Sequence, residues 1–157
     1  MKQPVTNHAP IIVCAAIILH CDRVLLTLRP ADKHLGGYWE FPGGKLEPGE
    51  SPHQALHREL REELDISIAI DDLLETVEHA YAWGRVRILG YLCRLAGGTI
   101  RHLEVADHSW VAIGDLNDVN ILPADQPFIE RLQALDLSSG NSADMRGSHG
   151  RQADHSL

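Results

Sequence analysis

The sequence predicts a single α/β domain, and three observations support that fold class. A continuous apolar run at residues 11–19 and a second one at residues 24–28 are rich in Ile, Val and Leu and have the length of buried strands. A later stretch carries Leu56, Leu60 and Leu64 four residues apart, which is the spacing of an amphipathic helix. At 157 residues the chain is long enough for one hydrophobic core and short for two.

Strands and an ordered loop are expected in the first third of the chain. The two apolar runs flank His20, Cys21 and Asp22, so they predict two buried strands joined by a short turn. Residues 29–49 are rich in glycine and proline among aromatic residues. This composition predicts an ordered loop region with one short strand near residues 38–41.

A helix is expected at residues 51–64, followed by more strands. Ser51 is a good capping residue, and Pro52 lacks the N–H that would have no partner at the first helical position. The three leucines then form the stripe that faces the core. Strand-like segments follow at residues 66–70, 75–82, 85–95 and 109–113, with a turn at Gly97-Gly98.

A second helix is expected near the C-terminal end of the domain. It should begin near residues 125–127 and bury an apolar face made of Phe128, Ile129, Leu132 and Leu135. Residues 138–157 have almost no large apolar side chains to offset the entropy of ordering, which predicts a disordered tail. With residues 1–9 as a flexible N-terminal tail, the folded domain is expected to span residues 10–137.

The charge balance argues against a protein that grips long nucleic acid. The formal net charge is −8 and no run of Lys or Arg occurs, whereas such binding needs a clustered basic surface. An acidic protein can still bind a polyphosphate when divalent cations supply the positive charge. We therefore expect a small-molecule substrate bridged by metal ions.

The cysteines and the apolar runs indicate the cellular compartment. Cys14, Cys21 and Cys93 show no metal-ligand spacing, and their odd number fits free thiols in a reducing compartment. The first residues lack a signal-peptide pattern, and the apolar run at residues 11–19 is too short to span a bilayer. We expect a cytoplasmic protein without membrane association, either a monomer or a homodimer.

An acidic cluster lies within residues 43–66. Residues three and four apart on a helix are neighbours, so Glu59, Glu62 and Glu63 present three carboxylates on one face, beside the leucine stripe. Glu50 lies in the turn before the helix and can reach the same region. The expected helix therefore concentrates its negative charge on one face.

A solvated acidic face is the ordinary explanation of such a cluster, but it fits poorly here. Like charges four residues apart destabilise a helix by about 0.2–0.5 kcal/mol. Glu62 and Glu63 also lie in the last turn, where the helix dipole favours cations. A bound cation would reverse both effects. Oxygen ligands with no convergent Cys or His favour Mg²⁺, for which Mn²⁺ can substitute.

The spacing of this cluster resembles the Nudix box, GX5EX7REUXEEXGU, in which U is a bulky aliphatic residue. Gly44 is followed after five residues by Glu50, and after seven more by the run from Arg58 to Ile66. A motif with this many fixed positions is specific. The one departure is Asp65, which stands where the family has glycine. Asp tolerates a left-handed backbone better than most residues do, so we expect the helix-closing turn to form.

Outside the box, the chain resembles the MutT-like branch of the Nudix hydrolases from about residue 13 to residue 135. The resemblance implies an α/β/α sandwich with a mixed β-sheet, in which the box forms a loop, a helix and a second loop. The matching features are Thr27-Leu28-Arg29, Ala31-Asp32-Lys33-His34, the run from Trp39 to Lys45, Glu104 six residues before Trp110, and Pro123-Ala124-Asp125.

The resemblance also implies roles for individual residues. Arg58 would orient the glutamates, and Lys45 would contact phosphate. Mg²⁺ would be bound by Glu59, Glu62, Glu63, Glu104 and the backbone carbonyl of Gly43. The nucleotide pocket would be lined by Arg29, His34, Glu40, Phe41, Pro42, Gly43, Lys45 and Asp125.

This set of residues suits the hydrolysis of a nucleoside triphosphate. Cations would neutralise the phosphate oxygens and activate a water molecule, and a carboxylate would accept its proton. Glu104 and Glu63 are both candidates for that base. By the resemblance, the expected substrate is 8-oxo-dGTP or a related damaged dNTP, cleaved to a monophosphate and pyrophosphate.

The sequence leaves the preferred substrate open. Asp125 fits a helix N-cap, a contact to the base, or both. MutT has an amide there, whereas an ionised Asp only accepts hydrogen bonds, so CTP or dCTP is an alternative. ADP-ribose is disfavoured as a substrate because the branch that cleaves it carries a downstream proline that this chain lacks. Tyr81 is a weak indication of a dinucleoside polyphosphate substrate. The remaining alternative is a non-catalytic nucleotide-binding module.

Overall fold

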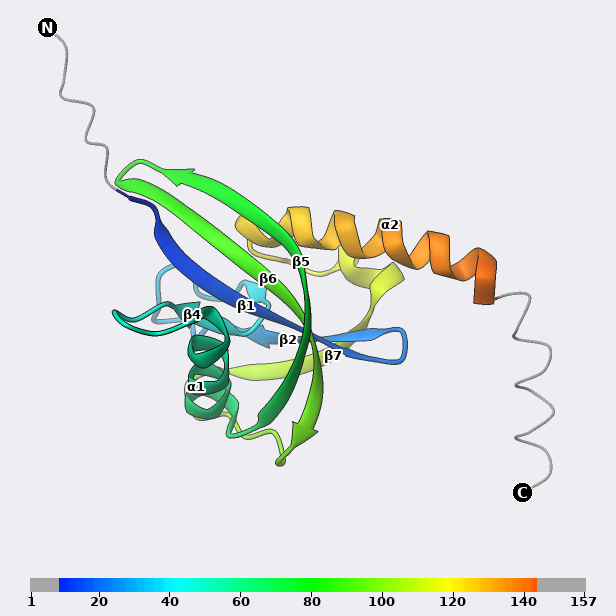
Figure 1. The fold of residues 1–157 in the computed structure, drawn as a ribbon, viewed down its shortest axis with the longest axis horizontal. Helices are drawn as coiled ribbons and strands as arrows, with labels where there is room; N and C mark the ends of the chain where they lie inside the picture. The colour runs from blue at the N-terminus through cyan, green and yellow to red at the C-terminus, as the bar shows by residue number, and fades with distance from the viewer. Residues whose placement is uncertain (1–8, 144–157) are drawn as a thin grey trace, which may run out of the picture.

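A mixed seven-stranded sheet forms the centre of the computed structural model, which describes residues 9–143 and side chains as far as residue 135 (Figure 1). The strand order is β3-β2-β1-β6-β5, with β4 paired to β1 and β7 paired to β2. The strands are β1 (Ile11–His20), β2 (Arg23–Leu28), β3 (Trp39–Glu40), β4 (Gly43–Lys45), β5 (Ser67–Tyr81), β6 (Gly84–Gly97) and β7 (Asp107–Ala112).

Strand β1 joins the two halves of the sheet. It runs parallel to β6, with Val13 opposite Ile88, and antiparallel to β4, with Cys14 opposite Gly44. At its end the chain turns directly into β2, which pairs antiparallel with β1, β3 and β7. Both expected N-terminal strands and the short turn between them are therefore present.

Two helices cover opposite faces of the sheet, α1 (Pro52–Leu64) and α2 (Gln126–Ala143) (Figure 1). Successive residues of a strand point to opposite faces. Cys14, Ala16 and Ile18 of β1 accordingly share a buried cluster with the leucines of α1. Ala15 and Ile17 share the other cluster with Phe128, Ile129 and Leu132 of α2. This arrangement is the expected α/β/α sandwich with a mixed sheet.

Helix α1 begins and ends as the sequence predicts. The Ser51 hydroxyl accepts a hydrogen bond from the Gln54 N–H at 3.2 Å, and the Gln54 side chain accepts one from the Ser51 N–H at 2.9 Å, which forms a capping box. At the other end Asp65 adopts the left-handed conformation, with φ 56° and ψ 41°. Its N–H bonds the Arg61 carbonyl at 3.1 Å, so the turn closes without the family glycine.

The sheet differs from the sequence expectation at β5 and β4. Strand β5 is one long strand where the sequence indicated two segments, and it contains register shifts between Ile70 and Leu73 and between Leu73 and Glu75. Such bulges let the exposed Asp71 and Asp72 interrupt the apolar pattern while the strand continues. Strand β4 has little side-chain signal because it begins with two glycines.

The C-terminal part of the domain contains η1 (Ile113–Asp118), η2 (Pro123–Asp125) and then α2, which starts where the sequence places a helix. Phe128, Ile129 and Leu132 are buried as expected, whereas Leu135 is half-buried. The helix runs on to Ala143, although the sequence predicts a tail from residue 138. Residues 1–8 and 144–157 lie outside the described residues. Within residues 9–143, no helix is long and apolar enough to cross a membrane.

Candidate active site

Two glycines of β4 let the acidic helix approach the centre of the sheet. A Cβ atom on Gly43 would lie 1.9 Å from the Cys14 carbonyl oxygen, so only glycine fits beside β1 there. A Cβ atom on Gly44 would lie 2.4 Å from the Cδ atom of Glu59. The carboxylate of Glu59 therefore packs directly against the bare backbone of β4.

Arg58 holds several glutamates of the box together. Its Nε lies 2.6 Å from Oε2 of Glu50, and one Nη donates to Glu59 at 2.9 Å and to Glu62 at 3.2 Å. The other Nη donates to the Lys45 carbonyl at 3.0 Å. These bonds fix the carboxylates of Glu50, Glu59 and Glu62 relative to β4.

Glu63 is the half-buried centre of a second group of carboxylates. Burial, together with the charges of Glu59, Glu40 and Glu104, raises its pKa to about 9. The N–H of Gly43 donates to Glu63 at 3.3 Å and opposes that rise. The cluster thus concentrates negative charge in a place where water cannot fully solvate it.

This donor set fits a divalent cation. The pKa of Glu59 is also raised, first by burial and then by neighbouring carboxylates, even though Arg58 acts in the opposite direction. One guanidinium therefore does not balance the cluster. Carboxylate and carbonyl oxygens without nitrogen or sulfur ligands are the donors that Mg²⁺ and Mn²⁺ prefer. The residues that would hold the ion are Glu59, Glu62, Glu63, Glu104 and the carbonyl of Gly43.

The loop before β7 brings Glu104 to this cluster from a distant part of the sequence. The N–H groups of Leu103 and Glu104 lie 3.0 and 3.4 Å from the Glu63 carbonyl at the end of α1. Glu104 is exposed and lines a cavity of about 450 Å³ together with Glu63, Glu40 and the basic Arg29 and Lys33. Its spacing to Trp110 was the signal that singled it out.

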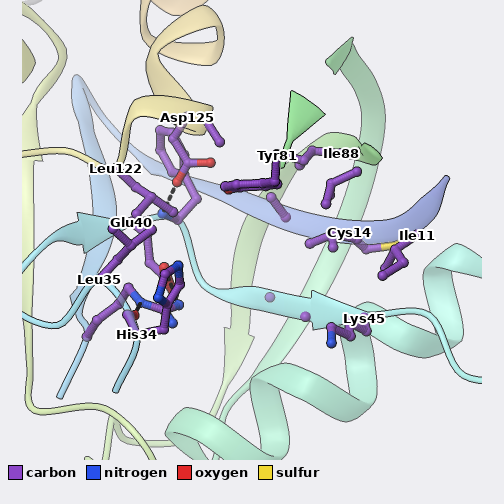
Figure 2. Close-up of a pocket in the computed structure, with 18 of the residues that line it drawn as sticks. Ile11, Cys14, His34, Leu35, Glu40, Lys45, Tyr81, Ile88, Leu122 and Asp125 are labelled. Atoms are coloured by element: carbon purple, nitrogen blue, oxygen red, sulfur yellow. Dashed lines mark hydrogen bonds and ion pairs between the residues drawn. The ribbon is translucent and has the colours of Figure 1, made fainter. Parts of the chain in front are cut away.

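A second cavity, of about 380 Å³, opens beside the acidic cluster (Figure 2). Its volume lies in the range of small-molecule sites, and Glu40 lines both cavities. Pro42 does not line it, and its carbonyl accepts a hydrogen bond from the Ala16 N–H at 2.8 Å. The other residues expected in the nucleotide pocket do line it, namely Arg29, His34, Glu40, Phe41, Gly43, Lys45 and Asp125.

One wall of this cavity is set by Arg29. Its Nη1 lies 2.9 Å from a carboxylate oxygen of Glu40, and its Nε donates to the His34 carbonyl at 2.9 Å. Burial raises the pKa of Glu40, and the adjacent guanidinium partly offsets that rise. Arg29 is therefore a positioned group of the cavity wall and not a free surface arginine.

Asp125 closes the far end of the cavity (Figure 2). Its carboxylate is buried and accepts a hydrogen bond from the Phe41 N–H at 3.1 Å, across 84 positions of sequence. Burial, helped by the charge of Glu40, raises the pKa of Asp125 to about 7. The carboxylate thus ties the start of α2 to the loop between β3 and β4, a contact that the capping explanation did not include.

Two aromatic residues at the β5–β6 turn also line the cavity. Tyr81 and Trp83 stack with ring centroids 5.2 Å apart and planes inclined by 5°. Trp83 is 63% exposed. Sequence reasoning considered Tyr81 for another reason and missed Trp83, because an aromatic residue next to a turn glycine carries no signal of a pocket.

The family of the chain follows from comparison with known proteins. Residues 13–131 match the model of the NUDIX domain, which covers more than half of the chain. The chain therefore belongs to the Nudix family. Its box, its site geometry and its relatives place it among the MutT-like Nudix hydrolases.

Individual relatives agree with this assignment. The 8-oxo-dGTP diphosphatase of Proteus vulgaris is 49% identical over 72 residues, which are 44% of this chain and 62% of that protein. The CTP pyrophosphohydrolase of Escherichia coli K12 is 35% identical over 123 residues, covering 78% of this chain and 91% of that protein. The solution structure of the E. coli ORF135 protein has a TM-score of 0.75 at 33% identity and covers 87% and 97% of the two chains.

Proposed function

We propose that this chain is a Mg²⁺-dependent pyrophosphohydrolase that cleaves 8-oxo-dGTP or a related damaged dNTP to the monophosphate and pyrophosphate. The observation that carries the proposal is the junction of two features at β4. A cluster of carboxylates around the half-buried Glu63 lies beside a nucleotide-sized cavity that ends at Asp125. If the base of a nucleotide occupied the cavity, its phosphate groups would extend past Glu40 toward the acidic cluster.

The side chains around the cluster would have different roles in such a reaction. When bound, Mg²⁺ would neutralise phosphate oxygens and lower the pKa of the attacking water. Glu63 and Glu104 are the two candidates for the carboxylate that accepts the proton of that water. Arg58 keeps the box glutamates in place through hydrogen bonds of 2.6–3.2 Å. Lys45 lies exposed at the cavity rim, where its ammonium group can contact phosphate.

A second candidate substrate is CTP or dCTP. Asp125, when ionised, offers only acceptors at the end of the cavity, and the exocyclic amino group of cytosine is a donor. When protonated, the same carboxyl can donate as well as accept, and the pKa of about 7 makes both forms available near neutral pH. The relative named CTP pyrophosphohydrolase supports keeping this candidate.

Pyrophosphate release from a panel of nucleotides tests the proposal. The panel contains 8-oxo-dGTP, dGTP, CTP, dCTP, ADP-ribose and a dinucleoside tetraphosphate, each with Mg²⁺ and with excess chelator. We expect the highest kcat/KM for 8-oxo-dGTP and no turnover with chelator. Turnover that persists in chelator would refute the metal-dependent mechanism, and a preference for CTP would replace the first substrate by the second.

Two variants make the assay specific for the cluster. Glu63→Gln removes a carboxylate from the cluster and should lower turnover by orders of magnitude. Glu130→Gln makes the same chemical change at an exposed position of α2 and should leave turnover unchanged. Equal activity of both variants would show that the Glu63 carboxylate takes no part in the chemistry.

A further inference from the structure

Three side chains of types that commonly bind metal ions meet around the start of β7, namely His102, Asp107 and His108. Nε2 of His102 lies 2.7 Å from Nδ1 of His108 and 3.8 Å from Oδ1 of Asp107. The three ligand atoms all lie within 4.8 Å of one another. None of these residues belongs to the Nudix box, which spans residues 44–66.

The distances are close to those of an occupied site. A histidine nitrogen lies about 2.0–2.1 Å from Zn²⁺, so two ligands of a tetrahedral ion are about 3.3 Å apart. The separations of 2.7 and 3.8 Å lie on either side of that value. Small side-chain rotations would suffice, because the side chains of His102 and Asp107 are 38% and 55% exposed. Water can complete the coordination from the open side.

The backbone holds this group in place from both sides. The N–H groups of Arg101 and Leu103 bond carbonyls at the end of α1 at 2.9 and 3.0 Å, and the Ala106 N–H bonds the Leu28 carbonyl of β2 at 2.9 Å. Asp107 is further restrained, because its Oδ1 accepts a hydrogen bond from the His108 N–H at 2.8 Å. The backbone that carries the three ligands is therefore ordered before any ion binds, which lowers the entropy cost of binding.

We propose that His102, Asp107 and His108 form a second cation site, separate from the acidic cluster and selective for Zn²⁺ and similar transition-metal ions over Mg²⁺. Two imidazole nitrogens and one carboxylate suit Zn²⁺, Co²⁺ or Ni²⁺, whereas Mg²⁺ prefers oxygen ligands and octahedral geometry. An ion at this site would link the loop to the first residues of β7. Glu104 lies between the ligands in sequence, so the ion would also restrain that residue.

Calorimetric titration with Zn²⁺ in excess Mg²⁺ tests the site on the full chain. Excess Mg²⁺ competes with Zn²⁺ for the acidic cluster, and the binding that is lost in the histidine variants reports the ligands proposed here. We expect one site in the wild type and an affinity lower by about tenfold or more in His102→Ala and in His108→Gln. His57→Ala is the matched control, because it removes an exposed histidine of α1 and should leave the affinity unchanged.

Hydrogen exchange supplies a second readout on the same proteins. The amides of Leu103 and Glu104 should exchange more slowly with Zn²⁺ in the wild type, and at an unchanged rate in His102→Ala. No Zn²⁺ binding in the wild type, or equal binding in His102→Ala and His57→Ala, would show only a hydrogen-bonded histidine pair and overturn the proposal. Binding without slower exchange would overturn the restraint on Glu104. Neither measurement uses a substrate, so the outcome is independent of the hydrolysis assay.

Discussion

Replacement of Asp125 by Asn tests what the buried carboxylate does to the stability of the folded state. Burial and the charge of Glu40 raise its pKa from 3.8 to about 7. A carboxyl with a raised pKa destabilises the folded state where it is ionised, so the penalty is complete above pH 7. The penalty decreases as the pH falls through 7, and it disappears near pH 4, where the unfolded chain also takes up the proton. From 3.8 to 7, the full penalty corresponds to about 4 kcal/mol.

The Asn variant keeps an oxygen that can accept from the Phe41 N–H and never ionises. We expect it to be more stable than the wild type by up to about 4 kcal/mol at a pH above 7, with a difference near zero at about pH 4. Urea unfolding of both proteins across this range measures the difference. Asp115→Asn, which makes the same chemical change at an exposed position, is the control. A stability gain for Asp125→Asn that is equal at both ends of the range would refute the reasoning.

The same variant also tests whether Asp125 contacts the base. An amide group places a donor where the ionised carboxylate had an acceptor, and a mispaired buried group costs about 1–3 kcal/mol. The ranking of purine and pyrimidine triphosphates by kcat/KM should then change by about ten- to a hundredfold. An unchanged ranking would assign recognition of the base to other residues of the cavity, such as Arg29 or Trp83.

Three further predictions concern α1 and its surroundings. Glu63→Gln should lower kcat by orders of magnitude and leave the urea midpoint equal or higher, and a normal kcat would remove Glu63 from the mechanism. Gly44→Ala places a Cβ atom 2.4 Å from Cδ of Glu59, so it should displace that carboxylate and lower kcat/KM by about tenfold or more with little change in Tm, because a flexible side chain can move aside. Asp65→Gly should raise stability by about 0.5–1 kcal/mol at unchanged kcat, since glycine adopts the left-handed conformation without strain. A lower urea midpoint in that variant would contradict the strain argument.

Patterns within a few residues of sequence predicted the helix and the strands that are determined by neighbouring residues. The capping pair at Ser51, the leucine stripe of α1 and the apolar runs of β1 and β2 all describe interactions within a few residues, and each is present. The continuity of β5 could not be predicted in this way. Its bulges near Leu73 are set by pairing with β6, and the exposed acidic pair before them removes the alternation that marks a strand.

Within the site, too, local spacing predicted some residues, whereas the fold brings others together from distant parts of the sequence. The spacing of the box located Glu59 and Glu63, because both lie on one helix. The hydrogen bond between Asp125 and the Phe41 N–H joins residues that are 84 positions apart, and no local pattern encodes it. The stacked pair of Tyr81 and Trp83 reaches the cavity only because the β5–β6 hairpin places it there.

The apolar face of α1 offsets the free-energy cost of the acidic cluster on the same helix. Without a cation, the pKa of about 9 means that Glu63 destabilises the folded state above pH 4.5, by about 3 kcal/mol at pH 7. The fully buried Leu56, Leu60 and Leu64 each contribute about 1.5–3 kcal/mol, so the apolar face of α1 outweighs that penalty. A cation bound beside Glu63 would favour its ionised form and offset that penalty. The helix can therefore keep its carboxylates crowded and partly desolvated before an ion binds, because the adjoining leucine stripe holds it in the fold.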